Sequence, residues 1–395
     1  MKVKSVRDLK NLKGRRVLLR ADFNVGLAGG RVRDDFRITA GLPTIRHLIS
    51  RKAKVIIMTH VGKPAGVEAK FSTRPIARDL EKKLGIKVAH AADCVGFKAE
   101  EAVAKLEPGN VLMLENLRFH PEEKANDRRF ASRLARLADV YVNDAFAVCH
   151  RVHASVEAIR KYLPRVAGLL LESEIKNLDR IIAPKRPLVV IVGGAKISTK
   201  LPLLIRLSKK ADKVLIGGGT ANNFLFALGQ EIGKSLADKK DYVLAGQAAE
   251  YYEKTGDLLN VLPVDFITSK TKTGNGQAAM KTLAQIERDD YIFDVGPKTL
   301  KIFSGIIKKA NTIVWNGPLG MFENEKFKHG TFALARLVAG RASGRAFGLV
   351  GGGETIEAFR AAGIADYVDW ISTGGGAMLA YLGGEKMPGL KGIIK

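Results

Sequence analysis

Cysteine, aromatic residues and long apolar runs are scarce in this chain, and each scarcity excludes a class of protein. The 395 residues include two cysteines, Cys94 and Cys149. Two are too few for a disulfide framework, and reduced thiols are typical of a cytoplasmic protein. No run of about 18 apolar residues exists, so we expect no membrane span, and no apolar stretch of signal-peptide length follows Met1. Aromatic residues make up 7% and are not interleaved with basic ones, which argues against a stacking surface for single-stranded nucleic acid.

Sequence patterns for several common sites are also missing. No Cys/His spacing predicts a zinc site, and no Ser–His–Asp set can be recognised. The string Gly229–Ser235 resembles a P-loop but is one residue short, and it does not follow a clear strand. We interpret it as an ordinary loop.

Negative charge is scarce as well, and the excess of positive charge lies mostly in the first half. The formal net charge is +25, and residues 1–170 hold 34 Lys and Arg against 18 Asp and Glu. A basic half indicates an anionic partner, either a multiply phosphorylated small molecule or nucleic acid. A general bias in surface composition is the alternative, although it does not explain basic residues at particular strand ends.

The dominant pattern is a short apolar run, a turn and then an amphipathic helical stretch. Strands rich in Val, Ile and Leu that alternate with helices predict a parallel sheet covered on both faces. Two series of such runs predict an α/β protein with two doubly wound, Rossmann-like parallel-sheet domains joined by a hinge helix. The first series is Arg16–Arg20, Val55–Thr59, Val111–Leu114, Val140–Asn143 and Val166–Leu171. The second is Leu188–Val192, Lys213–Ile216, Val261–Thr268, Thr312–Trp315 and Ala346–Val350.

A helix followed by a proline-rich break marks the boundary between the two series. Residues 172–182 carry apolar side chains at helical spacing, and Ala183–Pro187 contains two prolines. We therefore expect a basic domain at 1–170, a hinge helix and linker at 171–186 and a second domain at 187–381.

Ligands of open α/β sheets bind at the carboxyl ends of the strands, so the residues that follow each run are the candidates. In the first half these residues are mainly basic and amide side chains, which suit an anionic ligand. They are Asp22, Asn24, His60, Lys63, Glu115, Asn116, Arg118, Asn143, Asp144, His150 and Arg151.

In the second half the runs end in glycine clusters. Such clusters just before helices let backbone N–H groups approach a phosphate at the positive end of the helix dipole. One glycine turn is weak evidence, but several in one domain favour a phosphate-binding site. The clusters are Gly193–Lys196, Gly217–Gly219, Asn316–Pro318, Gly351–Glu354 and Thr373–Gly376.

At this level of detail the whole chain resembles the phosphoglycerate kinase family. The resemblance implies reversible phosphoryl transfer between 1,3-bisphosphoglycerate and Mg-ADP, giving 3-phosphoglycerate and ATP, in glycolysis or gluconeogenesis on hinge closure of the two domains. The resemblance rests on the segments Val17–Asn24, Asp34–Arg37, Thr59–Pro64, Leu114–Phe119, Val142–Phe146, His150–His153, Gly193–Lys196, Asp294–Pro297, Val314–Pro318, Gly351–Thr355 and Ser372–Gly376.

The same resemblance implies roles for individual residues. Phosphoglycerate would bind to Asp22, Asn24, Arg37, His60, Lys63, Arg118 and Arg151. The nucleotide would bind to Lys196, Lys200, Gly217, Gly218, Gly219, Asn316, Leu319, Glu323, Gly353, Glu354 and Thr355, with Mg²⁺ on Glu354. The catalytic set would be Arg37, Lys196, Gly374, Gly375 and Gly376, because guanidinium groups and helix N-termini stabilise spread negative charge.

Some positions depart from the family pattern. Lys63 stands where arginine is usual, which keeps the charge but loses bidentate phosphate contact. Thr199 and Glu354 stand where aspartate is usual. The alternative function is therefore a divergent, weakly active member that acts mainly as a polyanion (RNA) binding protein. In either case we expect a monomer, and we expect residues of about 382–395 to pack back on the first domain.

Overall fold

The chain divides into two compact units. In the computed structural model, the described residues are 2–195, 200, 204, 207, 210–237, 246 and 262–394. The first unit comprises Met1–Lys176 and Lys386–Lys395, and the second comprises Asn177–Glu385. The division falls inside helix α5 (Leu169–Ile182). No helix among the described residues has both the length and the apolar character needed to cross a membrane.

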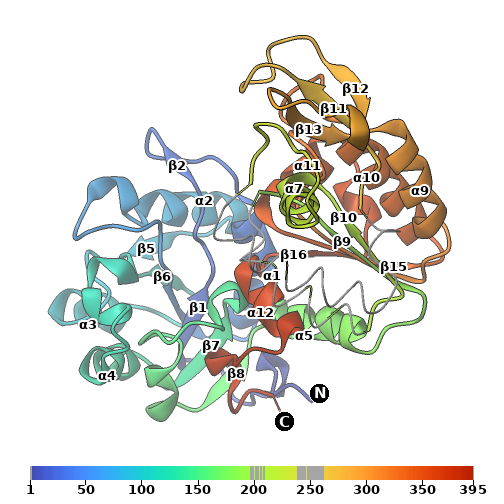
Figure 1. The fold of residues 1–395 in the computed structure, drawn as a ribbon. Helices are drawn as coiled ribbons and strands as arrows, with labels where there is room; N and C mark the ends of the chain where they lie inside the picture. The colour runs from blue at the N-terminus through green and yellow to red at the C-terminus, as the bar shows by residue number, and fades with distance from the viewer. Residues whose placement is uncertain are drawn as a thin grey trace. The chain divides into compact units, whose positions relative to one another are not determined.

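The first unit is built on a six-stranded parallel sheet (Figure 1). The strand order is β5-β6-β4-β1-β7-β8, so β1 lies near the middle, between β4 and β7. Continuous Val, Ile and Leu runs form these strands because both faces of the sheet are buried. The strands are β1 (Arg16–Ala21), β4 (Lys54–Met58), β5 (Val88–His90), β6 (Val111–Met113), β7 (Val140–Asp144) and β8 (Arg165–Ala167).

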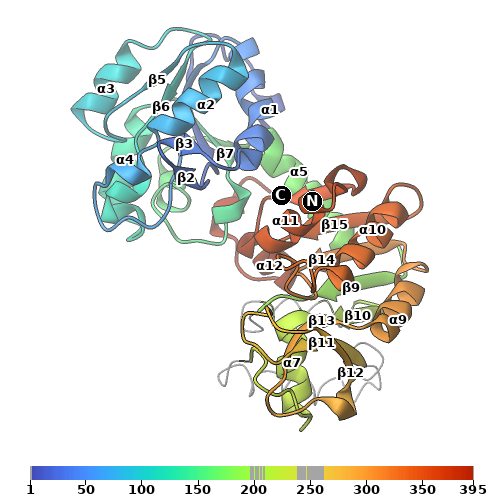
Figure 2. The ribbon, with the colours of Figure 1, turned by 90° about the horizontal axis from the view of Figure 1, so that it is seen from above.

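Alternate residues of these strands enter two separate hydrophobic clusters, one on each face. Val17 and Leu19 of β1 pack with side chains of α1 (Phe36–Ser50) and α2 (Arg74–Leu84). Leu18 packs with side chains of α3 (Phe97–Ala104) and α4 (Arg128–Arg136). These two helices lie on the other face of the sheet from α1 (Figure 2). The period-two alternation of strand side chains therefore supports helices on both sides, as the α/β pattern predicts.

The second unit contains a five-stranded parallel sheet in the order β10-β9-β14-β15-β16. All five strands are parallel, which confirms the fold class of two parallel-sheet units. Its strands are β9 (Leu188–Val192), β10 (Lys213–Ile216), β14 (Thr312–Asn316), β15 (Phe347–Gly351) and β16 (Trp370–Ser372). Its described helices are α7 (Gly218–Ala227), α9 (Pro297–Ile307), α10 (His329–Ala342), α11 (Gly353–Ala361) and α12 (Gly376–Gly383).

One predicted strand lies in another sheet, and a second ends earlier than predicted. The apolar run at 261–268 does not join the parallel sheet; β11 (Asp265–Ser269) lies in an antiparallel sheet between β12 (Ala279–Thr282) and β13 (Tyr291–Val295). A short apolar run does not reveal which strands it pairs with, and here the partners are neighbours in sequence.

The strand in the run at 166–171 ends at Ala167, because helix α5 begins at Leu169. The carboxylate of Asp144 accepts hydrogen bonds from the N–H groups of Leu170 and Leu171 in the first turn of this helix.

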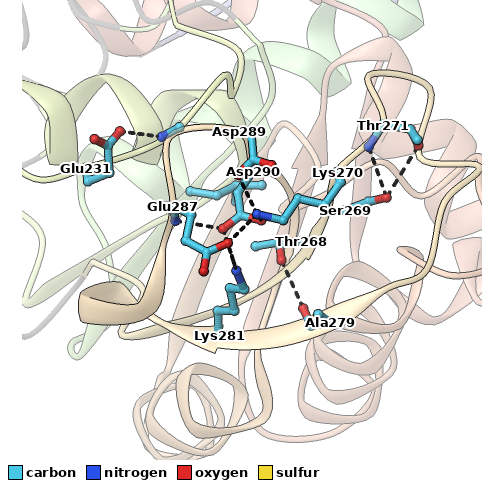
Figure 3. Close-up of polar contacts among 12 residues, drawn as sticks. Glu231, Thr268, Ser269, Lys270, Thr271, Ala279, Lys281, Glu287, Asp289 and Asp290 are labelled. Carbon is cyan, nitrogen blue, oxygen red and sulfur yellow. Dashed lines mark hydrogen bonds and ion pairs between the residues drawn. The ribbon is translucent and has the colours of Figure 1, made fainter.

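The antiparallel sheet carries a compact network of ion pairs (Figure 3). Lys270 contacts Glu287, lies 2.5 Å from a carboxylate oxygen of Asp289 and lies 3.1 Å from Oδ1 of Asp290. Lys281 lies 2.8 Å from the other oxygen of Asp290. Two lysines thus offset most of the negative charge of these three carboxylates.

Residues near both ends of the chain pack together in the first unit. The N–H of Lys4 donates to the carbonyl of Ile393 over 2.8 Å, and the N–H of Gly389 donates to the carbonyl of Cys149 over 2.9 Å. The side-chain amide of Asn143 donates to the carbonyl of Gly389 over 3.1 Å. These bonds hold the last described residues beside the carboxyl end of β7.

Shorter elements complete the chain. The hairpin consists of β2 (Leu27–Ala28) and β3 (Arg31–Val32). The 3-10 helices are η1 (Val6–Asp8), η2 (Ala69–Phe71), η3 (Leu117–Phe119), η4 (Pro121–Glu123), η5 (Phe146–Val148), η6 (Ala158–Lys161), η8 (Leu283–Gln285), η9 (Ala365–Tyr367) and η10 (Pro388–Leu390).

The buried carboxyl group of Asp144 predicts a pH dependence of stability. Burial raises its pKa from 3.8 to about 6, against hydrogen bonds from Thr44, Leu171 and Leu170 that lower it. The pKa of Asp144 is thus higher in the folded than in the unfolded state, so the protonated carboxyl stabilises the fold. This contribution is complete below about pH 4 and is lost as the pH rises through 6, which lowers the free energy of unfolding by roughly 2–3 kcal/mol. Asp144→Asn keeps an oxygen for the two N–H groups but cannot ionise. Urea denaturation from pH 4 to 8 should therefore show a smaller fall in the free energy of unfolding for the variant; parallel profiles would contradict this.

Candidate active site

A fully buried arginine, Arg20, lies at the carboxyl end of β1 in the first unit. Its guanidinium donates to Oγ of Ser155 over 3.1 Å, to the carbonyl of Ala21 over 2.5 Å and to Nδ1 of His60 over 3.1 Å. Burial lowers the pKa of Arg20, while the nearby charge of Glu123 opposes that shift. The sequence analysis did not single out Arg20; the available signal was one basic residue inside an apolar strand.

The buried carboxylate of Glu123 balances this charge. Its two oxygens accept hydrogen bonds from the backbone N–H of Ser155 over 2.9 Å and from the Ser155 hydroxyl over 2.6 Å. Nδ1 of His153 lies 3.8 Å from Glu123 Oε1. Ser155 therefore links the carboxylate to the guanidinium of Arg20, and the network fixes the position of a buried charge. Sequence reasoning also missed Glu123 and Ser155, because neither follows a strand.

Asn116 and Arg118 connect the loop after β6 to the loop after β4. The side-chain oxygen of Asn116 accepts from the N–H groups of Val61 and Arg118, and its amide donates to the carbonyl of Val61 over 2.9 Å. Arg118 donates to the carbonyl of Gly62 over 2.6 Å, and its Nε is buried with no hydrogen-bond partner. Asn24 accepts from the N–H of Gly62 over 2.8 Å. These contacts bring Asn24 and Arg118 to the same loop.

The guanidinium groups near this loop lack a balancing anion of their own. Burial, and then the charges of Arg151 and Arg20, lower the pKa of Arg118 to about 10. Burial, followed by Arg20, also lowers the pKa of Arg151. Within the described ranges, neither Arg118 nor Arg151 has an ion-pair partner. Mutual repulsion among buried and half-buried cations is characteristic of a site that awaits an anion.

Burial and neighbouring positive charges favour the neutral form of the histidines in this region. Burial, then the charges of Arg20, Arg118, Arg151 and His153, hold the pKa of His60 well below its usual value. Burial and the same arginines lower the pKa of His153 to about 4. The structure thus places His60 against Arg20 as a hydrogen-bond acceptor rather than as a second charge.

Asp22 and Arg37 form an ion pair at the edge of the arginine group. Arg37, in the first turn of α1, donates to one oxygen of the buried Asp22 carboxylate, and the other oxygen is buried with no hydrogen-bond partner. The Arg37 side chain remains 31% exposed, so the guanidinium can also reach a ligand. Lys63 is exposed directly after Gly62. The predicted residues of the first half therefore gather around the carboxyl ends of β1 and β4.

The second unit contains a cavity of about 350 Å³ at the carboxyl ends of β9 and β10. Most of its lining is apolar, which suits a flat organic ring. Five of the predicted nucleotide residues line it: Gly218, Gly219, Leu319, Glu323 and Glu354. Lys234, in the loop that resembles a P-loop, and Asp294 also line it, although neither was predicted as a site residue. Burial raises the pKa of Asp294 to about 7, against hydrogen bonds from the N–H groups of Gly330 and Val295.

Glycine is required where the ends of β9 and β14 meet beside this cavity. Gly317 has φ +96°, and a Cβ there would lie 2.2 Å from both the carbonyl oxygen of Gly193 and Nζ of Lys200. Lys200 donates to the carbonyl of Gly193, and burial, opposed by Glu354, lowers its pKa to about 8. Nδ2 of Asn316 donates to the carbonyl of Gly351 over 3.0 Å.

The remaining predicted residues lie beside the cavity or outside the described ranges. Thr355 accepts from the N–H of Gly317 over 2.6 Å, and Gly353 begins α11. Gly374 and Gly375 precede α12, which begins at Gly376. Gly217 precedes α7 and contacts Leu319. Lys196 and Thr199 lie outside the described residues.

Comparison with known proteins gives one family. The family model for phosphoglycerate kinase matches residues 6–385. A phosphoglycerate kinase of Pelotomaculum thermopropionicum is 45% identical over 397 residues, covering 100% of both chains. The solved structure of phosphoglycerate kinase from Coxiella burnetii has a TM-score of 0.85 at 39% identity, covering 99% of this chain and 98% of that one. The corresponding structure from Pyrococcus horikoshii has a TM-score of 0.86 at 34% identity, covering 98% of both.

The balance between Glu123 and Arg20 predicts a specific loss of stability. Glu123→Gln should lower the free energy of unfolding by about 1–3 kcal/mol, because one Ser155 donor would then face an amide N–H group and Arg20 would lose its counter-charge. The neighbouring, exposed Glu122 supplies the control: Glu122→Gln should change stability by less than about 0.5 kcal/mol. Urea denaturation of both variants measures the difference, and equal effects would refute the role of Glu123.

Proposed function

The chain belongs to the phosphoglycerate kinase family, and on that basis we propose which of its residues hold each substrate and carry the phosphoryl transfer. Its activity is that of a phosphoglycerate kinase in glycolysis. In the forward direction, an oxygen of the ADP β-phosphate attacks the acyl phosphate of 1,3-bisphosphoglycerate. The bond between phosphorus and the carboxyl oxygen breaks, and 3-phosphoglycerate leaves as a carboxylate.

The first unit holds the phosphoglycerate in this proposal. The observation that carries it is the pair of guanidiniums of Arg118, which is buried, and Arg151, which is half-buried, beside the buried Arg20. Neither has an ion-pair partner among the described residues, and an organic phosphate supplies the missing negative charge. Asn24 and His60 offer further polar contacts at the same strand ends. Lys63 adds an exposed charge at the rim. Nucleic acid is too large to reach these buried and half-buried guanidinium groups, so it is the secondary candidate for the anionic partner.

The second unit holds the nucleotide. Gly217–Gly219 and Leu319 surround the adenine, and Glu323 contacts the ribose; the apolar lining of the cavity supports this placement. Lys200 and Lys196 bind the phosphates with Asn316, Gly353 and Thr355. The pKa of Lys200 near 8 supports this role, since an anionic phosphate would restore the full charge of a buried amine.

Glu354 is the chain's ligand for Mg²⁺. Its carboxylate lines the cavity at the start of α11, and its charge acts on the ammonium of Lys200. An oxygen donor beside nucleotide phosphates fits Mg²⁺, which takes one or two carboxylates, phosphate oxygens and water. When bound, the ion neutralises phosphate charge. Glutamate reaches about 1.5 Å further than the aspartate usual in the family, by one carbon–carbon bond, and it would hold the ion with the same negative charge.

Catalysis consists of positioning and charge stabilisation rather than covalent chemistry by the protein. Arg37 contacts the transferring phosphoryl group from the first unit, and the N–H groups of Gly374–Gly376 at the start of α12 contact it from the second. Lys196 assists on the nucleotide side. Because each unit carries one substrate, transfer requires closure about α5 once both are bound.

The proposal is tested first by activity. A coupled assay with 3-phosphoglycerate and Mg-ATP should show turnover in the range of about 1–100 s⁻¹ typical of kinases. Under the alternative, turnover would be near background and RNA would bind with an affinity that falls steeply with salt. That combination would overturn the kinase function.

Arg37→Ala separates transition-state stabilisation from substrate binding. We expect kcat to fall by about 100- to 1,000-fold while KM for 3-phosphoglycerate changes little, because one electrostatic donor to the moving charge is lost. Arg46→Ala removes an exposed arginine from the same helix and should leave kcat unchanged. A kcat within about threefold of the wild type in Arg37→Ala would refute the catalytic role.

The metal role of Glu354 predicts a changed Mg²⁺ dependence. Glu354→Ala should raise the Mg²⁺ concentration for half-maximal rate and reduce turnover, whereas Glu354→Asp should retain most activity because it restores the family's usual ligand. The exposed Glu357 lies on the same helix, and Glu357→Ala should leave the Mg²⁺ titration unchanged. If Glu354 only stabilises the helix N-terminus, worth about 0.3–1 kcal/mol, alanine will cost thermal stability and leave the Mg²⁺ dependence as it was.

A further inference from the structure

Three side chains with metal-binding atoms converge in the first unit, outside the residues assigned to catalysis. Asp93 and Cys94 lie in the loop between β5 and α3, and His120 lies between η3 and η4. One ligand atom from each lies within 4.8 Å of the other two. Nε2 of His120 is 2.7 Å from Oδ1 of Asp93. Asp93 and His120, 27 positions apart, are thus brought together by the parallel pairing of β5 with β6.

The two cysteines of the chain differ in their surroundings. Sγ of Cys149 accepts a hydrogen bond from Asn143 over 3.3 Å and donates to the carbonyl of Ala145 over 3.5 Å. Among the described residues, Sγ of Cys94 has no hydrogen-bond partner, although the thiol is buried. Cys149 is therefore satisfied within the fold, whereas Cys94 presents an unused sulfur beside an imidazole and a carboxylate.

The site also has a rigid side and an open side. The backbone N–H of Cys94 donates to Oδ1 of Asp93 over 2.6 Å, and the ring of His120 packs against Phe130 with centroids 5.2 Å apart. The side chains of Asp93 and His120 remain 38% and 26% exposed. A ligand can therefore enter from solvent and meet side chains whose positions are already restrained.

We propose that Asp93, Cys94 and His120 form a binding site for Zn²⁺, with water as the fourth ligand. Zn²⁺ is bound in proteins by cysteine sulfur, histidine nitrogen and carboxylate oxygen, and three protein ligands with one open position is an established arrangement for it. Mg²⁺ would not use this site, because it takes oxygen ligands and does not favour thiolate.

Among the described residues, a second acidic cluster does not offer the same chemistry. The cluster of Glu287, Asp289 and Asp290 also meets the spacing for a metal. However, Lys270 and Lys281 already contact its carboxylates (Figure 3), and it contains neither sulfur nor imidazole. The site at Cys94 has two ligand types that bind Zn²⁺ more strongly than they bind the alkaline-earth ions.

Binding exchanges protons for the ion. Cys94 loses its thiol proton to solvent and binds as a thiolate, and the hydrogen bond between His120 and Asp93 is replaced by bonds from each to Zn²⁺. One imidazole nitrogen must then be free of hydrogen. The ion's two positive charges are balanced by the thiolate and the carboxylate, which together carry two negative charges.

The position of His120 gives this site a link to the arginine group. His120 lies between Arg118 in η3 and Glu123 in η4, and its backbone N–H donates to the carbonyl of Leu117 over 3.2 Å. An ion that fixes His120 to the loop of Asp93 would restrain the segment that carries both Arg118 and Glu123. Zn²⁺ should therefore raise the thermal stability of the full chain.

The test uses the full-length, metal-free protein with Co²⁺ and Zn²⁺ as probes, in the presence of excess Mg²⁺. We expect one Zn²⁺ per chain by equilibrium dialysis, and Co²⁺ should give a thiolate-to-metal charge-transfer band in the near ultraviolet. Cys94→Ser and His120→Gln should each weaken Zn²⁺ binding by more than about tenfold, since loss of even an outer-shell partner costs 10- to 100-fold. Cys94→Ser should also abolish the band.

Cys149→Ser is the matched control, because it removes the other buried thiol of the chain and should leave Zn²⁺ affinity and the cobalt band unchanged. His120→Gln keeps the test valid if Cys94→Ser fails to fold, since His120 is partly exposed. Absence of stoichiometric Zn²⁺ binding would overturn the proposal, as would a cobalt spectrum without the band or equal affinities in the wild type and His120→Gln.

Discussion

The buried charge of Arg20 is the constraint on which the first unit depends. A guanidinium at the end of a central strand is tolerated only when its donors are bonded and a counter-charge is near. Ser155, Glu123 and His60 satisfy those conditions, and they come from three different segments of the chain. Satisfying one charge therefore fixes the loops that carry the other site residues, including Arg118 through the segment of Glu123.

In the second unit the main constraint is the close approach of backbone segments rather than a buried charge. Its parallel strands end where backbone must lie against backbone, and Gly317 meets Gly193 at a distance that no side chain would allow. The space that remains is a mainly apolar cavity with a buried amine, Lys200, and a carboxylate, Glu354, at its edge. Ring, phosphate and metal can thus be separated along one cavity. The zinc site proposed at Cys94 depends neither on a buried arginine nor on a close backbone approach, because it needs only the convergence of two loops beside β5 and β6.

Pattern reasoning worked where the signal was local. The parallel-sheet architecture followed from apolar runs of strand length, and the ranges of β9 and β10 agree with the predicted runs to the residue. Polar residues placed directly after a run, such as Asn24 and His60, lie together at the strand ends. It failed for β11, because a short, mostly buried run can have the same composition in a parallel and an antiparallel sheet. It also failed for Arg20 and Glu123, whose importance is visible only once their burial is known.

By itself the sequence determined the family, the two parallel sheets and the clusters of basic and glycine residues at strand ends, because these are properties of neighbouring residues. Tertiary structure decided which charges are buried, and hence which pKa values are shifted, as at Asp144 and Arg118. It also decided the grouping of Asp93, Cys94 and His120, which no Cys/His spacing indicates. The physical reason is that burial and ligand convergence depend on distances between segments, and strand pairing sets those distances after the local structure has formed.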